Sequence, residues 1–411
     1  MGKPTVISSL PKYLAIALGI SIPISVALDN LLMFLLAMLF LPFGLKSYWN
    51  ECTINPAARA GIVLFTALLT GCLWGAGGSG AALDTLGKYV DLAFIPIYLV
   101  VFRDETTRRA ALSAFFGMML LTLALSIMVG HGLIPVYRWM NVQTSSSEPT
   151  IFHGYIAQNY LMAFAAFLFI LRLVESKSAW TKWGYAVLAA LAAYDVLFLV
   201  SARTGPLVLF SLLGYLGWLW ASKGLGLDLK KIGIAMAATM AVILMTYHFS
   251  ARFQDRIALA VKEVKKWDAQ KPADINDSMG LRMEFYYQTF QIIAAHPLFG
   301  VGTGGFAKAY SDRAAPRGMH EVQNPHNEYL LIMAQLGIIG LLLLLFLFHR
   351  MWKGATLIKS EFHRNAARGL MLSTALVSLF NSPLLDHTEG LFFAFMSALF
   401  FAGAGQGKKS G

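Results

Sequence analysis

The stretch EYLLIMAQLGIIGLLLLLFLF, residues 328–348, contains one charged side chain, Glu328, at its first position. A helix needs about 20 mostly apolar residues to cross a bilayer, so this stretch predicts a membrane-spanning helix. NPHN, residues 324–327, stands directly before it. Asn324 has the side chain of a helix N-cap, and Pro325 suits a first helical position. We therefore expect His326 in the first turn of this helix, at the membrane surface.

The composition extends this prediction to the whole chain. Of the 411 residues, 57% are hydrophobic and 13% are charged, about half the charged share of an average soluble domain. This is the composition of an integral membrane protein. The formal net charge of +11 could indicate a nucleic-acid partner, but in a membrane protein basic residues hold loops on the cytoplasmic side. The two cysteines, Cys52 and Cys72, predict no disulfide and no cysteine metal site.

Apolar stretches recur along the chain, and we read about twelve of them as membrane crossings. They divide the chain into crossings 1–9 in residues 1–248, a periplasmic loop at 249–327 with two helices, and crossings 10–12 in residues 328–411. The predicted spans are 12–28, 31–45, 60–76, 91–102, 110–130, 154–171, 183–200, 205–221, 232–248, 328–348, 366–381 and 390–405.

The basic residues predict the orientation of these crossings. With both termini in the cytoplasm, 20 of the 33 lysines and arginines fall on the cytoplasmic side. Of the 13 others, ten lie in the loop at 249–327, whose length exempts it from the positive-inside rule. The short outer loops keep only Lys88, Arg138 and Arg203. This agreement favours twelve crossings with both ends inside.

The long external loop contains two helical patterns. Residues 251–267 place apolar side chains on one face and charges on the other, which predicts a helix on the membrane surface or against neighbouring helices. Residues 281–296 form the second pattern, which ends before Pro297. GVGTGG, residues 300–305, fits a dinucleotide fingerprint in spacing, but that site requires a preceding strand. We interpret it as a flexible loop of close approach between helices.

Three side chains on the predicted outer side suggest chemistry together. The positive end of a helix dipole would keep His326 largely neutral, as a general base requires. Arg203, in a short outer turn, and Arg282, at the start of the second loop helix, could hold a diphosphate with their planar forks. Each has a simpler interpretation: Arg203 could reach lipid phosphate, Arg282 could pair with a nearby acid, and His326 could cap or pack.

Other polar residues are weaker candidates for lining a substrate cleft. Asp195 is the only acid well inside an apolar segment, and Asn159, with Gln158, starts the sixth predicted crossing. Structural roles in capping and packing compete with functional ones at each position. The remaining candidates are Asn327, Asp386, His387 and Glu389.

Three stretches carry a resemblance to a known family: SARTG at 201–205, GLRMEFYYQTFQIIAAHPLFGVGTGGF at 280–306, and NPHNEYLLIMAQLGIIG at 324–340. In this order, and with the large loop in this place, the chain resembles the O-antigen ligase and polymerase superfamily of bacterial envelopes. The resemblance spans roughly residues 195–345. Elsewhere it rests only on hydropathy and on the number of crossings.

The resemblance implies a GT-C-like helical fold and an enzyme of the bacterial inner membrane. It implies transfer of a glycan from undecaprenyl diphosphate at the periplasmic face, without a cofactor or metal. Carried over by residue, His326 is the expected base that deprotonates the acceptor hydroxyl. Arg203 and Arg282 are the expected ligands of the donor diphosphate.

Among family members, a ligase transfers O-antigen polysaccharide to lipid A-core, a polymerase extends one lipid-linked glycan with another, and a protein O-oligosaccharyltransferase modifies proteins. The single large loop before the last crossings favours a ligase, and we expect no soluble domain after the final helix. Outside the family, a lipid-linked glycan transporter is disfavoured by the scarcity of charges in the membrane segments and of internal repeats. A non-catalytic scaffold stays open, and we expect no nucleic-acid partner.

Overall fold

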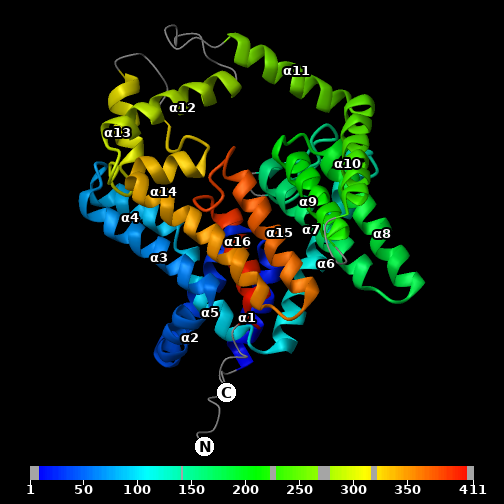
Figure 1. Cartoon of the computed structure of the whole chain (residues 1–411), viewed down its shortest axis with the longest axis horizontal. Coiled ribbons are helices and arrows are strands. Elements are labelled where there is room, and N and C mark those ends of the chain that lie inside the picture. The colour runs from blue at the N-terminus through cyan, green and yellow to red at the C-terminus, as the bar shows by residue number, and fades with distance from the viewer. Residues whose placement is uncertain (1–8, 140–141, 223–227, 267–277, 316–321, 405–411) are drawn as a thin grey trace, which may run out of the picture. The chain divides into compact units, whose positions relative to one another are not determined.

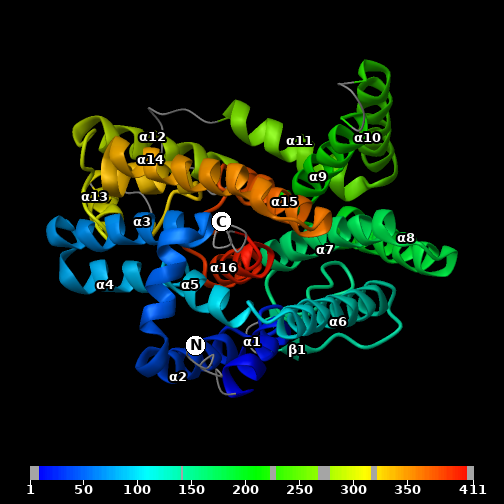
Figure 2. The same ribbon diagram turned by 60° about the horizontal axis from the view of Figure 1, so that its bottom comes forward.

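The computed structural model describes residues 9–139, 142–222, 228–266, 278–315 and 322–404. This part of the chain is almost entirely helical, as predicted (Figures 1 and 2). Its strands are the antiparallel pair β1 (Arg138–Trp139) and β2 (Val142–Gln143). Both ends of the chain, residues 1–8 and 405–411, and two parts of the predicted periplasmic loop, residues 267–277 and 316–321, lie outside the described residues.

Seven helices of the described chain are long and apolar enough to cross a membrane, and α2 adds an eighth if its two halves, Val26–Pro42 and Gly44–Ile54, count as one span. An all-α, multi-pass membrane protein is thereby confirmed. The other predicted crossings contain shorter helices, so the count of twelve and the orientation stay predictions. The seven spans are Pro56–Trp74, Glu105–Gly130, Tyr155–Glu175, Ala179–Leu199, Thr204–Ala221, Leu229–Phe249 and Glu328–Leu357. The shorter helices are α1 (Ser9–Ser21), α5 (Asp91–Val101), α15 (Glu361–Val377) and α16 (His387–Phe401).

The chain divides into two compact units. Unit 1 comprises residues 1–40, 101–257 and 360–373, and unit 2 comprises 41–100, 258–359 and 374–411. The boundaries fall within α2, α5, α11 (Ala251–Lys266) and α15, and just before α15. Helices α1, α6 (Glu105–Gly130), α7 (Tyr155–Glu175), α8 (Ala179–Tyr194), α9 (Thr204–Ala221) and α10 (Leu229–Phe249) lie in unit 1. Helices α3 (Pro56–Gly71), α4 (Gly78–Lys88), α12 (Ser278–Ala295), α13 (Phe306–Ala314), α14 (Glu328–Gly354) and α16 lie in unit 2.

In unit 1, α7 forms the packing centre. It contacts both α8 and α9, and most of its length from Gln158 to Phe169 is buried. The small Gly369 of α15 admits the ring of Phe167, because a Cβ at that position would lie 2.2 Å from the ring. Close packing through small residues substitutes for the hydrophobic driving force that is missing between helices in lipid. α1 packs against α6, and α10 against α9 (Figure 2).

In unit 2, α14 lies along α3 and against α12 (Figures 1 and 2). Its apolar stretch is not one continuous helix, because Gly337 has φ 65° and breaks it. The broken turn is held by the loop after α12. The amides of Val301 and Gly302 donate to the carbonyls of Ala334 and Gln335 at 2.9 and 2.8 Å. Irregular backbone within a membrane protein has to be satisfied by other protein groups, and this loop satisfies it.

The GVGTGG stretch is therefore a docked loop, and the expected close approach is confirmed. Gly302 has φ 79°, and a Cβ there would lie 2.5 Å from the backbone of Gly75. The Ala76 amide donates to the carbonyl of Val301 at 2.9 Å, and the Thr303 amide donates to that of Gly71 at 3.0 Å. Backbone hydrogen bonds to α14 and to the chain after α3 hold the loop against both, and its flexibility stays a prediction.

Both predicted helices of the external segment are present. α11 covers Ala251–Lys266 and α12 covers Ser278–Ala295. On α11 the apolar side chains of Ile257, Val261 and Val264 are exposed. This exposed apolar face agrees with the amphipathic pattern of the sequence.

Candidate functional site

His326 lies before α14 and not inside it, which corrects the predicted helix start. The N-cap is Asn327, whose side chain accepts a hydrogen bond from the Leu330 amide at 3.0 Å. The Asn324 side chain instead accepts from the amide of His326 at 2.8 Å and forms a turn over Pro325. His326 has φ 54°, a left-handed conformation that is uncommon for a residue with a side chain. Such conformations gather at functional sites, where the surrounding structure enforces them.

A polar relay connects the ring of His326 to a carboxylate. Nδ1 of His326 lies 3.4 Å from Oδ1 of Asn381, and Nδ2 of Asn381 donates to Oδ2 of Asp386 at 3.1 Å. Because the Asn381 amino group faces Asp386, its carbonyl oxygen faces the imidazole. That oxygen can only accept, so Nδ1 carries the hydrogen and Nε2 keeps a lone pair.

The surroundings of His326 favour the neutral imidazole. Burial has the largest effect and lowers its pKa, while the hydrogen bond to Asn381 raises it. The charge of Arg282 lowers the pKa further, and the carboxylate of Asp386 raises it, with a net lowering. Burial also raises the pKa of Asp386.

Helix α12 brings three side chains to the loop that holds His326. Arg282 is half-buried and close enough to act on the imidazole electrostatically. One turn later, the hydroxyl of Tyr286 lies 3.3 Å from the carbonyl of His326 and 3.1 Å from that of Leu379. The Phe285 ring lies 6.1 Å from the imidazole, centre to centre. These contacts hold the His326 backbone and place a permanent positive charge beside its ring.

The neighbours of His326 in the sequence serve the fold. Besides capping α14, Asn327 donates from Nδ2 to the carbonyl of Leu379 at 3.0 Å, and its place in the substrate cleft stays a prediction. The buried Glu328 accepts from the hydroxyl of Tyr89 at 2.7 Å and from the amide of Leu384 at 2.9 Å. Together they bind the segment 378–386, which carries Asn381 and Asp386, to the start of α14.

The last predicted candidates lie around α16. Nδ1 of His387 is 3.8 Å from the carboxylate of Asp91. Glu389 is buried within α16 and acts electrostatically on Asp386. Neither side chain contacts His326 through a hydrogen bond that the structure describes.

The remaining candidates belong to unit 1. Arg203 is the N-cap residue of α9 and is half-buried. Asn159, on α7, donates from Nδ2 to the carbonyl of Val200 at 3.3 Å. A Cβ on Gly205 would lie 2.1 Å from Oδ1 of Asn159, so the glycine of SARTG is required for this close approach. Asn159 therefore supports the turn that presents Arg203.

Asp195 is fully buried at the start of a π-helical turn, Asp195–Leu199, that ends α8. Its Oδ1 is bonded to the hydroxyl of Ser126 on α6, and the same hydroxyl lies 3.0 Å from the carbonyl of Pro149. Gln158 also donates to the Pro149 carbonyl, at 3.2 Å, and accepts from the amide of Ile151 at 2.7 Å. Asp195 and Gln158 thus hold the loop before α7, and neither is directed to solvent.

In unit 2 the structure brings together His326, Arg282 and Asp386, which lie in three separate segments of the chain. Sequence reasoning missed Asn381, the link between the imidazole and Asp386, and Tyr286, which holds the His326 carbonyl. Asn381 opens the NSP turn between two apolar segments, where an amide side chain is an ordinary turn former, so its pattern carries no functional signal.

One comparison with known proteins finds a relation. A protein-family model described as O-antigen ligase matches residues 186–345, which contain Arg203, Arg282 and His326. The match supports the O-antigen ligase and polymerase superfamily and confirms the resemblance seen in the sequence. No curated protein matches the chain.

Proposed function

Since residues 186–345 match the O-antigen ligase family, we propose that this protein is an O-antigen ligase of the bacterial inner membrane. It transfers O-antigen polysaccharide from undecaprenyl diphosphate to a hydroxyl of lipid A-core at the periplasmic face, on a GT-C-like fold with both termini in the cytoplasm. The observation that carries the proposal is the half-buried imidazole of His326, whose Nδ1 faces Asn381 and which lies within electrostatic range of the guanidinium of Arg282.

The transfer is one displacement at the anomeric carbon of the donor. The acceptor hydroxyl oxygen attacks that carbon while its proton moves to Nε2 of His326. The bond from the anomeric carbon to the diphosphate oxygen breaks, and the electron pair leaves with undecaprenyl diphosphate. A single displacement from the face opposite the leaving group inverts the anomeric configuration. His326 acts as a general base, which contributes about 10²–10⁴-fold to such rates.

Arg282 and Arg203 hold the donor diphosphate in this proposal. A guanidinium forms paired hydrogen bonds with two phosphate oxygens and compensates the negative charge that grows as the bond breaks. Because the same positive charge of Arg282 disfavours the imidazolium, it also keeps His326 ready to accept a proton. One side chain thus serves the leaving group and the base.

Asn381 and Asp386 position the base. With Nδ1 bonded to Asn381, the lone pair of Nε2 is available to the acceptor. Asp386 orients the Asn381 amide through its own hydrogen bond, and its negative charge opposes that of Arg282 at the imidazole. The carboxylate does not need to take up the proton.

The test is a transfer assay with the purified protein in lipid nanodiscs, undecaprenyl diphosphate-linked O-antigen and lipid A-core. Both lipids are followed by gel mobility, and His326→Ala runs beside the wild type. We expect the wild type to shift the lipid A-core band and the variant to lose this shift while it still binds the donor. Substantial turnover by the variant would contradict the role of His326 as the base.

The assay also separates the other members of the superfamily. A lengthened donor with unmodified lipid A-core would mean a polymerase. Transfer to an added pilin-type protein would mean a protein O-oligosaccharyltransferase. If neither lipid nor protein changes, the enzymatic proposal fails and a glycan transporter or a scaffold remains.

A further inference from the structure

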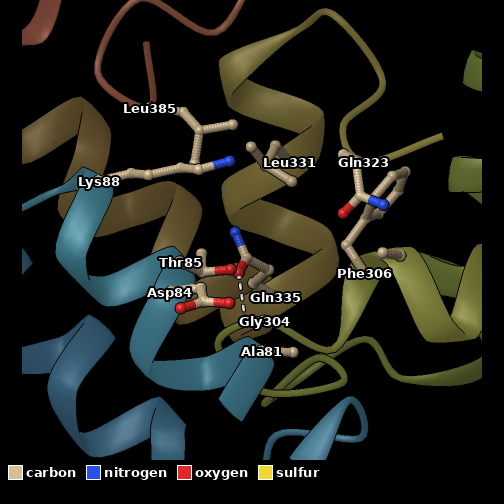
Figure 3. Close-up of a pocket in the computed structure, with 11 residues that line it drawn as sticks. Ala81, Asp84, Thr85, Lys88, Gly304, Phe306, Gln323, Leu331, Gln335 and Leu385 are labelled. Atoms are coloured by element: carbon tan, nitrogen blue, oxygen red, sulfur yellow. Dashed lines mark hydrogen bonds between the residues drawn. The ribbon is translucent and has the colours of Figure 1, made fainter. Parts of the chain in front are cut away.

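Unit 2 contains a polar cavity of about 380 Å³ (Figure 3). Asp84, Thr85 and Lys88 of α4 line one side, and Gln335 of α14 lines another. The wall is completed by Ala81, Gly304, Phe306, Ala307, Gln323, Leu331 and Leu385. None of the polar side chains on α4 or α14 has a part in the chemistry described above.

The cavity adjoins the reacting groups. Leu385 directly precedes Asp386, and Gln323 directly precedes Asn324, whose side chain holds the turn of His326. The ammonium of Lys88 acts electrostatically on the carboxylate of Asp386. A molecule bound in the cavity would therefore lie near the segment that carries Asp386 and near the turn that carries His326.

Within the cavity, Gln335 is held in one orientation. Its Oε1 accepts from the amide of Gly304 at 2.8 Å, and the residue is 1% exposed. The Nε2 amino group interacts with the hydroxyl of Tyr89, but within the described residues it makes no hydrogen bond of good geometry. In Figure 3 this nitrogen points into the space between Thr85, Lys88 and Leu331. An amide amino group has two hydrogens to donate, so beside the interaction with Tyr89 it can donate to a ligand.

The lining matches a sugar ring better than a diphosphate or a lipid tail. One carboxylate and one ammonium leave the lining without the excess of cations that a diphosphate requires. Asp84 accepts from hydroxyls, and Lys88 and Gln335 donate to them, whereas Phe306 and Leu331 offer apolar surface to the carbon–hydrogen face of a ring. The volume is at the lower end of the about 300–1,000 Å³ usual for small-molecule sites, so it suits a short glycan segment.

We propose that this cavity is a glycan subsite that binds a sugar residue of a transferase substrate and directs it toward His326. The proposal rests on the glycosyl transfer proposed above. Its chemistry is shared by two sources, the core oligosaccharide of the acceptor and the O-antigen repeat of the donor, and the experiment distinguishes them.

The first experiment measures binding without turnover. The full-length protein in nanodiscs is mixed with core oligosaccharide released from lipid A or with the O-antigen repeat oligosaccharide, and saturation-transfer NMR records which sugar protons contact the protein. We expect saturation transfer from the protein to one of the two oligosaccharides, and we expect Asp84→Asn and Lys88→Gln to lose this signal. A saturation-transfer signal on neither oligosaccharide, or a signal that both variants retain, would overturn the subsite.

The second experiment measures the KM of each substrate separately. Asp84→Asn should raise the KM of one substrate by about tenfold, the usual size of a lost hydrogen bond to a charged group, and leave the other KM unchanged. The side chains of Asp84 and Lys88 lie on the exposed face of α4, so these variants should fold. Unchanged values of both KM would overturn the proposal.

Helix α13 offers matched controls, because Lys308 and Asp312 form an exposed ion pair outside the cavity. Lys308→Gln and Asp312→Asn make the same chemical changes and should leave both KM values and NMR contacts unchanged. If the wild type transfers no glycan, the proposed function fails, but the binding experiment still decides whether the cavity takes a sugar.

Discussion

The polar groups of unit 1 and those around His326 in unit 2 differ in what they bond to. Asn159 and Gln158 are buried, and they bond to carbonyls and amides of the loops beside α7. His326 is half-buried, and only its Nδ1 is bonded to a side chain of the described structure. Buried amides with backbone partners stabilise a fold. A half-buried imidazole with one nitrogen oriented and the other available can exchange a proton with a substrate.

The two regions also differ in charge. Around His326, the fixed positive charge of Arg282 and the carboxylate of Asp386 act on the same imidazole in opposite directions. Asp195 in unit 1 instead bonds to the neutral hydroxyl of Ser126. Opposed charges about one titratable group adjust its proton affinity. From this difference we expect His326 to take part in the reaction, and Asp195 and Asn159 to support the fold.

The largest expected effect tests this assignment directly. We expect His326→Ala to reduce transfer by about 10²–10⁴-fold or more, since it removes the base. Asp195→Asn keeps the shape of the side chain and should leave kcat within about threefold, because the amide can still accept from Ser126. The measurement is kcat in the lipid A-core assay. Equal losses of kcat in the two variants would contradict the difference drawn between His326 and Asp195, because Asp195 would then take part in the reaction.

Substitution of Arg282 should have the second-largest effect on the reaction. Arg282→Lys keeps one charge but loses the planar fork, so donor affinity and kcat should both fall by about tenfold or more. Arg203→Lys should do the same if both arginines hold the diphosphate. Donor binding is measured by isothermal titration with undecaprenyl diphosphate. Wild-type affinity in both lysine variants would exclude the diphosphate clamp.

Asn381→Leu should have an intermediate effect with a characteristic pH dependence. The base acts when neutral, so kcat/KM of the wild type should rise with pH and level off above the pKa of His326, which burial and Arg282 keep below about 6.5. Removing the bond from Asn381, which raises this pKa, should move the rise to lower pH. At neutral pH the rate should fall by several-fold because the tautomer is no longer fixed.

Arg282→Gln is the opposite control for this profile. It removes a charge that lowers the pKa of His326, so the rise should move to higher pH. A pH profile that does not move in either variant would show that the titrating group is not His326.

The sequence predicted the elements of the site better than their assembly. Hydropathy located the long helices, and the three motifs located Arg203, Arg282 and His326, because apolar length and motif spacing are local properties of the chain. The partner of His326 is Asn381, 55 positions later, and only tertiary folding brings them together. The helix start was misplaced because Asn324 and Asn327 are both good caps, and contacts of Asn327 with Leu379 decide between them.

The break in α14 was also invisible to hydropathy. Apolar residues on both sides of Gly337 give one continuous signal, and a single glycine is tolerated in many helices. The loop of residues 300–305 supplies the compensating bonds from elsewhere in the sequence. The family motifs at 280–306 and 324–340 are therefore joined by backbone hydrogen bonds. A local sequence pattern cannot predict such a contact between distant segments.

The smallest expected effect on catalysis concerns the support of the SARTG turn. Asn159→Leu removes the bond to the Val200 carbonyl and leaves that buried acceptor unpaired, which should cost about 1–3 kcal/mol of stability. If Asn159 only holds the turn, the thermal unfolding temperature should fall while both KM values stay within about twofold for the folded fraction. Gly205→Ala should destabilise the same turn through its clash with Asn159, and the double variant Asn159→Ala with Gly205→Ala should recover part of that loss. A selective rise in the KM of the acceptor in Asn159→Leu, without loss of stability, would instead place Asn159 in the substrate cleft.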